Sequence, residues 1–421
     1  MASVVWEWRA EVGSGLALMV AFWLVDSAVG GLGAQVVVIA AGIAAYWFRR
    51  RLTPVLDQLR RLSVRHSWAR ATRVCGLAGP FGTRPRVLQV VTAPFGDDLL
   101  VQMPVASHVA ELEEAAEPLA AALGVREIRV RRSADNAALA HVVVVRRDSL
   151  AHGSFPWPLV DAREASLWDP IPVGLDENGR PAAIGLPERN VLVGGEPGAG
   201  KSVFLSVLIA AAALDPAVTL TLLDGKLVEL AAWRGCATNT VGPSIPDAIE
   251  VLGQIRSEMD ARYRELLAKR LRKVAPGGGM PLHVVVVDEL AFYLGGSDRK
   301  LRAEVTELLR DLVSRGRAAG IIVLAATQKP SADVIPTQVR DLFGFRVALR
   351  CSTPQASDTV LGQGWAALGY SAAAIDPSAR GVGFLLAEGG VPVRFRSCHL
   401  SDHQIDAIAG RAERLRHGGG R

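Results

Sequence analysis

The sequence predicts an α/β fold in which a parallel sheet forms the larger domain, a small α+β domain precedes it, and two apolar helices begin the chain. Apolar, β-branched runs alternate with helical segments over the C-terminal half, which is typical of parallel sheets with right-handed crossovers. Short strand-like runs surround one amphipathic segment between residues 86 and 150. Before them, residues 12–48 contain a single charged side chain, Asp26.

The N-terminal apolar stretch fits a hairpin of two membrane helices over residues 1–48. One helix of that length would measure about 55 Å, against about 30 Å of hydrocarbon. Two shorter spans with a turn near Asp26 and the glycines at 30, 31 and 33 fit better. A signal peptide is the competing interpretation, but the N-terminus lacks a basic lead and the run is too long. We therefore predict a multi-pass protein of a bacterial cell membrane.

A belt of arginines follows the apolar stretch. Residues 49–86 hold ten arginines and one acid, Asp57, whereas the whole chain of 421 residues has a net charge of +5. Positive charge beside a span stays on the cytoplasmic side, so the larger domains are expected in the cytoplasm. We interpret residues 49–85 as a juxtamembrane linker that suits anionic lipid headgroups better than nucleic acid. Four scattered cysteines without a C-x-x-C pair argue against zinc and disulfides.

Elements of the two larger domains are expected as follows. The small α+β domain, 86–150, should contain strands near 87–91, 99–103, 127–131 and 141–146 and a helix over 109–123. A proline-containing linker over about 156–172 should lead into the larger domain, 151–400. Its strands are expected at 190–194, 218–223, 283–287, 321–326 and 343–350. A basic tail, 401–421, is expected to fray from residue 411.

A glycine-rich loop between a strand and a helix identifies the chemistry of the larger domain. Its residues are Gly195, Glu196, Pro197, Gly198, Ala199, Gly200, Lys201 and Ser202. Such a loop aims backbone N–H groups and a helix N-terminus at the phosphates of a nucleotide. Lys201 adds a cation at the β- and γ-phosphates, and the Ser202 hydroxyl is placed to ligate Mg²⁺. The pattern predicts a P-loop NTPase domain, with a RecA-like parallel sheet, that binds ATP or GTP.

Two carboxylates after a second strand indicate hydrolysis. Asp288 and Glu289 follow the apolar run 283–287, and ligands of open α/β sheets lie beyond the carboxyl ends of strands. Asp288 is expected to hold Mg²⁺ through water, and Glu289 to polarise the attacking water. Thr327 and Gln328 end the strand 321–326 beside the expected γ-phosphate, where they can report hydrolysis. The sequence has no Asn-Lys-x-Asp motif for guanine, which favours ATP.

Three further segments resemble one family, the FtsK/SpoIIIE double-stranded DNA translocases of the FtsK–HerA class. They are residues 314–321 running into 326–330, the segment 224–230, and the segment 257–263. The resemblance implies a hexameric ring with double-stranded DNA through its centre and ATP between subunits. It also implies that Arg317 completes a neighbouring subunit's site, as arginine fingers do. Two departures are Gly225 in place of a proline and the run Ala356-Ser357-Asp358-Thr359, which lacks the arginine of the family.

The layout further resembles one branch of that family. Two predicted spans, one motor and a short tail are similar to the actinobacterial translocases that move plasmid or integrative-element DNA between cells. Chromosome segregation and the ATPase of type VII protein secretion remain the alternatives. Without a winged helix, DNA choice would fall to a partner protein. Arg234 and the basic run 269–273 are the candidates for gripping DNA, although such a run is more often a solvated helix face.

Overall fold

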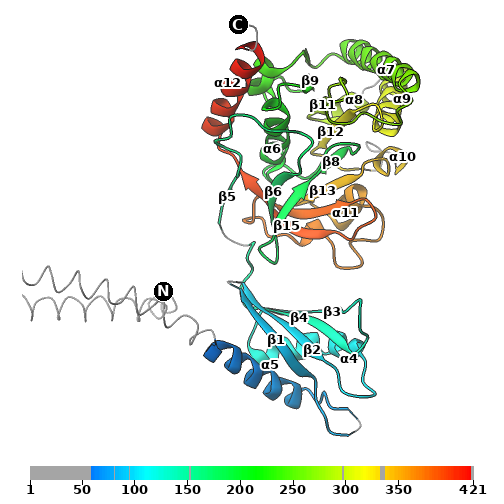
Figure 1. Cartoon of the computed structure of the whole chain (residues 1–421). Coiled ribbons are helices and arrows are strands. Elements are labelled where there is room, and N and C mark those ends of the chain that lie inside the picture. The colour runs from blue at the N-terminus through cyan, green and yellow to red at the C-terminus, as the bar shows by residue number, and fades with distance from the viewer. Residues whose placement is uncertain are drawn as a thin grey trace, which may run out of the picture. The chain divides into compact units, whose positions relative to one another are not determined.

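The structure, a computed structural model, describes residues 58–79, 81–93, 95–150, 153–295, 298–331 and 337–418. The chain divides into two compact units, Met1–Arg147 and Asp148–Arg421 (Figure 1). The predicted membrane hairpin at 1–48 lies outside the described residues. Within the described part of the chain, no helix combines the length and hydrophobicity that crossing a bilayer requires.

The first unit is built on a four-stranded antiparallel sheet in the order β1-β2-β4-β3. The four strands predicted here are all present, as β1 (Arg86–Ala93), β2 (Gly96–Gln102), β3 (Glu127–Arg132) and β4 (Leu139–Val145). The expected single helix over 109–123 is instead two, α4 (Val109–Glu114) and α5 (Ala116–Leu123). Pro118 explains the interruption, because a proline is tolerated in the first turn of a helix but not in its interior.

A helix over residues 58–74 completes the core of this unit. Trp68 is 2 % exposed and packs in the same apolar cluster as Leu99, while its indole N–H donates to the carbonyl of Pro85 at 3.0 Å. The buried carboxylate of Asp97 pairs with Arg60 of the helix at 3.5 Å and with Arg146 at 2.6 Å. Part of the predicted linker therefore belongs to the core of the small unit.

The second unit contains the predicted parallel strands in adjacent positions. Their order is β10-β9-β11-β12-β8-β13, and every neighbouring pair in that series is parallel. The bounds are β8 (Val191–Gly194), β9 (Thr219–Leu223), β10 (Asn239–Val241), β11 (His283–Val287), β12 (Ile321–Thr327) and β13 (Phe345–Leu349). All side chains of β8, β11 and β12 are buried, as expected of strands covered on both faces.

The sheet is mixed, which corrects the expectation of a purely parallel one. Beyond β13 it continues antiparallel through β14 (Val382–Ala387), β15 (Val393–His399), β6 (Ile171–Asp176) and β7 (Pro181–Ile184), and β5 (Phe155–Pro156) pairs with β15. The predicted linker thus ends within strand β6. The linker also contains Trp157, which is 1 % exposed and donates to the carbonyl of Pro172 at 3.0 Å.

Helices cover both faces of this sheet (Figure 1). On one face α6 (Lys201–Ala213), α12 (Asp402–Gly418) and the 3₁₀ turn η1 (Ala231–Cys236) share one apolar core. A second core holds α7 (Ile245–Ala268), α8 (Leu290–Leu294), α9 (Arg299–Arg315), α10 (Thr337–Arg340) and α11 (Pro354–Leu361). This arrangement leaves the carboxyl ends of the parallel strands open for a ligand.

The C-terminal segment is a docked helix, so the expectation that it frays from residue 411 is wrong. The apolar face of α12 is buried at Ile408, Ala409 and Ala412. Arg416 donates hydrogen bonds at 2.8–3.0 Å to four carbonyls at the end of α6 and just beyond it, those of Ala212, Ala213, Asp215 and Val218. The carbonyls of Ala212 and Ala213 lie in the last turn of α6, where intrahelical donors run out, and the Arg416 guanidinium supplies donors to them.

Candidate functional site: a nucleotide site at the edge of the parallel sheet

The phosphate-binding loop lies between β8 and α6, as predicted. Gly200 is the N-cap of α6 and has φ of 103°, a conformation that side chains beyond glycine rarely adopt. A Cβ at this position would also lie 3.1 Å from the backbone of Gly381. Backbone hydrogen bonds to other segments fix the loop, including those from the N–H of Glu196 to the carbonyl of Arg350 and from the N–H of Gly381 to the carbonyl of Ala199, both 2.9 Å.

Lys201 and Asp288 meet at the bottom of the site. The Lys201 ammonium donates to the backbone carbonyl of Asp288 at 3.2 Å, and the two residues are 6 % and 2 % exposed. Burial lowers the pKa of Lys201, although the nearby carboxylate of Glu289 opposes that shift. A cation buried without a close carboxylate hydrogen bond is suited to receive phosphate oxygens.

The carboxylate of Asp288 fits a magnesium site. One oxygen, Oδ1, accepts the N–H of Gly225 at 2.9 Å, whereas the buried Oδ2 has no hydrogen-bond partner within the described residues. Burial raises the pKa of this carboxyl from 3.8 to about 6, a shift that a bound cation would reverse. Ser202 supplies a hydroxyl, which donates to Glu229 at 2.8 Å. A hydroxyl and a carboxylate are oxygen ligands that Mg²⁺ prefers.

Glu289 is held by the strand that neighbours its own. Its Oε1 accepts the Thr327 hydroxyl at 2.8 Å, and the N–H of Gln328 donates to both carboxylate oxygens at 3.1 and 3.2 Å. A further bond comes from the N–H of Ala291 at 3.4 Å. The sequence placed these residues near one another, and the structure brings them into direct contact. The carboxylate is thereby oriented at the open end of β11 and β12.

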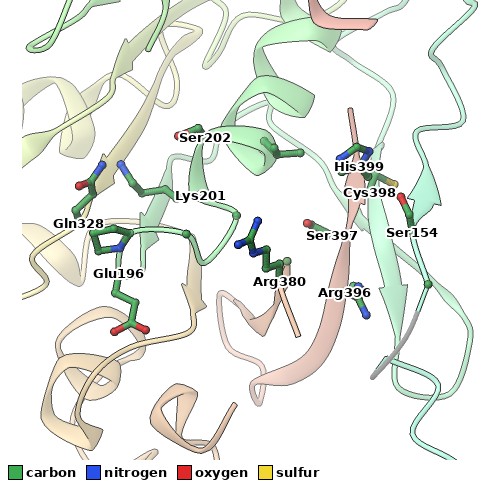
Figure 2. A pocket seen from close by; sticks show the side chains of 16 residues that line it. Ser154, Glu196, Lys201, Ser202, Gln328, Arg380, Arg396, Ser397, Cys398 and His399 are labelled. Atoms are coloured by element: carbon green, nitrogen blue, oxygen red, sulfur yellow. The ribbon is translucent and has the colours of Figure 1, made fainter. Parts of the chain in front are cut away.

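A cavity of 370 Å³ extends from the phosphate-binding loop to strand β15. Lys201, Ser202 and Gln328 lie on one side of it, and Ser397 and His399 lie on the other (Figure 2). Arg380 lies between the loop and β15 in this view, and together with Arg396 it gives the cavity two further cations. The sequence analysis missed these residues because they lie on antiparallel strands, or next to them, that it did not predict. One available signal was the Gly389-Gly390 turn between β14 and β15.

Two predicted site residues lie differently from expectation. The Glu196 side chain pairs with Arg350 and its backbone N–H donates to the Arg350 carbonyl, so this residue braces the loop and leaves neither group for phosphate. Arg317 precedes β12, while the phosphate-binding loop follows the neighbouring parallel strand β8. The two therefore lie at opposite ends of these strands, and the seven residues of β12 separate the ends by about 23 Å. The structure therefore brings together Lys201, Ser202, Asp288, Glu289 and Gln328 but leaves Arg317 outside its own subunit's site.

The fold and this site define a P-loop ATPase domain. Its phosphate-binding loop and its paired carboxylates lie at the same end of the parallel strands of a mixed sheet. Residues 162–363 match the FtsK/SpoIIIE family. Over these residues the chain thus contains an ATPase domain that matches the FtsK/SpoIIIE family.

Curated relatives share about a quarter to a third of their aligned residues with this chain. The DNA translocase FtsK of Staphylococcus epidermidis is 27 % identical over 308 residues, which are 68 % of this chain and 38 % of that protein. FtsK of Lactiplantibacillus plantarum is 27 % identical over 362 residues, 78 % and 42 % of the two chains. The DNA translocase SftA of Bacillus subtilis is 30 % identical over 254 residues, 56 % and 25 %. The chain spans less than half the length of these relatives.

Two solved structures share the fold. The pCW3 conjugation coupling protein TcpA, a monomer form with ATPγS, has a TM-score of 0.55 at 19 % identity and covers 84 % of this chain and 99 % of its own. EssC, ATPases 2 and 3, from Geobacillus thermodenitrificans has a TM-score of 0.53 at 15 % identity and covers 64 % and 52 %. The likeness to TcpA extends beyond the segment that the family match covers.

Proposed function

We propose that this protein is an ATP-driven translocase of double-stranded DNA that works as a membrane-anchored ring. The observation that carries the proposal is that Lys201, Asp288 and Glu289 lie together at the carboxyl ends of the parallel strands, in a domain that matches the FtsK/SpoIIIE family. Relatives across the family match are DNA translocases by name. The same geometry without an intact base or lysine would favour a scaffold instead of a motor.

Each side chain has a distinct task in the proposed hydrolysis. Lys201 and the loop N–H groups bind the β- and γ-phosphates. Ser202 and Asp288 would hold Mg²⁺, which neutralises charge on the phosphates when bound. Glu289, oriented by Thr327 and Gln328, accepts a proton from water or orients it for attack. Gln328, whose backbone contacts that carboxylate, is placed to respond when the γ-phosphate leaves.

The biological setting is proposed to be conjugal transfer of plasmid or integrative-element DNA between bacterial cells. Support comes from the fold likeness to a conjugation coupling protein along nearly its whole length and from the apolar stretch 12–48. In this proposal residues 1–48 anchor a hexameric ring in the cell membrane with the motor in the cytoplasm, and a partner protein selects the DNA. Chromosome segregation uses the same motor chemistry and differs in the DNA moved.

The candidates for DNA contact are only partly available in the structure. Arg234 donates to the carbonyl of Leu227 at 2.9 Å and lies 3.9 Å from Asp224. Within the basic run, Lys269 pairs with Glu265 and Lys273 with Glu188. These pairs are exposed and weak, so DNA phosphates could displace the acids. The run stays a candidate for phosphate contacts.

DNA-stimulated ATP hydrolysis is the experiment that tests the proposal. The full-length protein is assayed with and without duplex DNA, and the Lys201→Ala variant serves as the inactive control. We expect duplex DNA to raise the hydrolysis rate at least several-fold. A rate that ignores DNA, and rises instead with an exported protein substrate, would assign the chain to secretion. A rate unaffected by either would reject translocation of both kinds of cargo.

A further inference from the structure

All three nitrogens of the Arg317 guanidinium donate hydrogen bonds within its own subunit. Its Nε donates to the backbone carbonyl of Glu188 at 2.6 Å. Its two terminal nitrogens donate to the two carboxylate oxygens of Glu388 at 2.8 and 3.2 Å. This is a bidentate pair, the geometry in which arginine binds carboxylates and phosphates most strongly. An arginine in this state has no free fork to offer a phosphate.

The pair is nevertheless accessible from outside the subunit. The side chains of Arg317 and Glu388 are 38 % and 49 % exposed. The hydrogen bonds from Arg317 hold the pKa of Glu388 below its usual value, with a smaller contribution from the nearby charge of Arg189. Glu388 is therefore ionised at neutral pH and competes with any other anion for Arg317.

The backbone that carries Arg317 is fixed, so only its side chain can move. The Arg262 guanidinium donates to the carbonyl of Ala319 at 2.8 Å, and the Val274 N–H donates to that of Ala318 at 2.9 Å. The Tyr263 hydroxyl donates to the carbonyl of Arg315 at 2.5 Å. Three carbonyls around Arg317 are thus held by α7 and the segment after it. This bracing leaves the choice between Glu388 and another anion to rotation of one side chain.

Glu388 lies on a hairpin whose other end borders the nucleotide cavity. The residue directly follows β14, in the turn that leads to β15. At the opposite end of these strands, Gly381 donates to the carbonyl of Ala199 in the phosphate-binding loop at 2.9 Å. The Ser397 N–H donates to the carbonyl of Gly381 at 2.8 Å. One antiparallel pair of strands therefore connects the subunit's own nucleotide loop with the residue that holds its arginine.

We propose that Glu388 is a positioning residue that holds Arg317 within its own subunit until the arginine is released to complete a neighbouring nucleotide site. The inference rests on the proposed function, in which Arg317 acts across a subunit interface. The carboxylate of Glu388 and the γ-phosphate of a neighbour require the same two nitrogens, so Arg317 binds one or the other. The β14–β15 hairpin gives the nucleotide state of one subunit a path to the arginine that serves the next.

The test compares single-turnover ATP hydrolysis by assembled wild-type protein and by the Glu388→Gln variant, without DNA. Glutamine keeps the size of the side chain and removes its charge. Because exposed ion pairs are weak, we expect a rate increase of about two- to fivefold, with ATP affinity unchanged. The matched control is Glu127→Gln, since Glu127 forms a bidentate pair with Arg129 at 2.8 and 2.9 Å and is 44 % exposed. That control should leave the rate unchanged.

A double variant separates this inference from the proposed function. In the Arg317→Ala background, the Glu388→Gln change should have no effect on the rate. If Arg317→Ala hydrolyses slowly but Glu388→Gln hydrolyses at or below the wild-type rate, the holding role is wrong and the role of Arg317 stands. If Arg317→Ala hydrolyses as fast as wild type while DNA stimulation persists, the trans role of Arg317 is wrong and the inference falls with it. A Glu388→Gln effect limited to melting temperature would mark the pair as structural only.

Discussion

Glu289 and Thr327 are joined by a hydrogen bond of 2.8 Å between a carboxylate oxygen and a hydroxyl. Thr327 is the last residue of β12, Glu289 follows the end of the adjacent parallel strand β11, and Val287 of β11 lies opposite Ala325 of β12. The general base of the proposed reaction is therefore hydrogen-bonded to the end of β12, next to the expected position of the γ-phosphate. Any shift of that strand end after phosphate release would reorient Glu289, which gives the hydrolysis step a direct structural readout.

Removing the base while keeping its hydrogen bond should separate binding from turnover. Glu289→Gln retains an oxygen that accepts from Thr327, so ATP binding should persist while turnover falls by a factor of 10² or more, about 3 kcal/mol. Lys201→Ala should instead weaken ATP binding itself, because the cation at the phosphates is lost. Nucleotide titration and steady-state hydrolysis measure the two effects. Wild-type turnover by Glu289→Gln would reject its assignment as the base.

Arg317 should be required in trans. Arg317→Ala is expected to bind ATP normally and to hydrolyse it slowly, because Arg317 lies at the end of the parallel strands opposite its own phosphate-binding loop. Mixing Arg317→Ala with Glu289→Gln subunits should restore part of the activity, since some interfaces then pair an intact base with an intact arginine. Hydrolysis is measured across mixing ratios in assemblies verified to contain both variants. Strict absence of rescue in them would count against action across an interface.

The parallel and the antiparallel parts of the sheet differ in how well the sequence predicted them. Loop 195–202 and the strand that precedes Asp288 are local patterns, and the structure has both where they were expected. Strands β6 and β7 were missed because Pro170 and Pro172 suggested a linker, although Asn178-Gly179 is a hairpin signal. Gly179 indeed has φ of 70°.

Contacts between distant segments were beyond reach. The bonds from Ser202 to Glu229 and from Arg317 to Glu388 join residues 27 and 71 positions apart. No periodicity encodes such pairs, because they depend on which strands become neighbours. The C-terminal helix was misjudged for a similar reason. Its charges suggested a solvated tail, whereas Ile408, Ala409 and Ala412 form a buried stripe.

The buried carboxylate of Asp288 should make the nucleotide-free protein less stable as pH rises. Its folded pKa of about 6 lies above the ordinary 3.8 because burial disfavours the charged form. The cost is therefore absent below about pH 4, grows between pH 4 and 6, and is complete above pH 6. Asp288→Asn should raise the free energy of unfolding at pH 7.5 by about 2–3 kcal/mol while abolishing magnesium-dependent nucleotide binding.

Thermal unfolding without Mg²⁺ and nucleotide, recorded at pH 4 and at pH 7.5, checks this prediction. The exposed Asp406 on α12 provides the control, and Asp406→Asn should not alter the difference between the two pH values. A variant Asp288→Asn that is no more stable than wild type at pH 7.5 would show that the site relieves its buried charge in another way.

Docking of α12 should depend on Arg416 more than on any other charge of the helix. The guanidinium donates to four carbonyls at and beyond the end of α6, and its loss would leave these acceptors with poorer partners. Arg416→Ala should lower the free energy of unfolding by about 2–4 kcal/mol. The exposed Arg414 lies on the same helix, so Arg414→Ala removes an equal charge as a matched control and should cost under about 0.5 kcal/mol.

Hydrogen exchange locates the effect as well as its size. In Arg416→Ala, the amides of α12 and of the last turn of α6 should exchange faster, while those of β11 and β12 should keep their protection. The Gly235 backbone approaches α12 so closely that an added Cβ would lie 2.7 Å from the Glu413 carboxyl, so exchange should also rise in η1. Equal exchange in the two arginine variants would mean that apolar packing alone docks the helix. Loosening of α12 should also weaken magnesium-dependent ATP binding in Arg416→Ala but not in Arg414→Ala. The reason is that η1 directly follows the segment that carries Glu229, and the Glu229 carboxylate accepts the Ser202 hydroxyl.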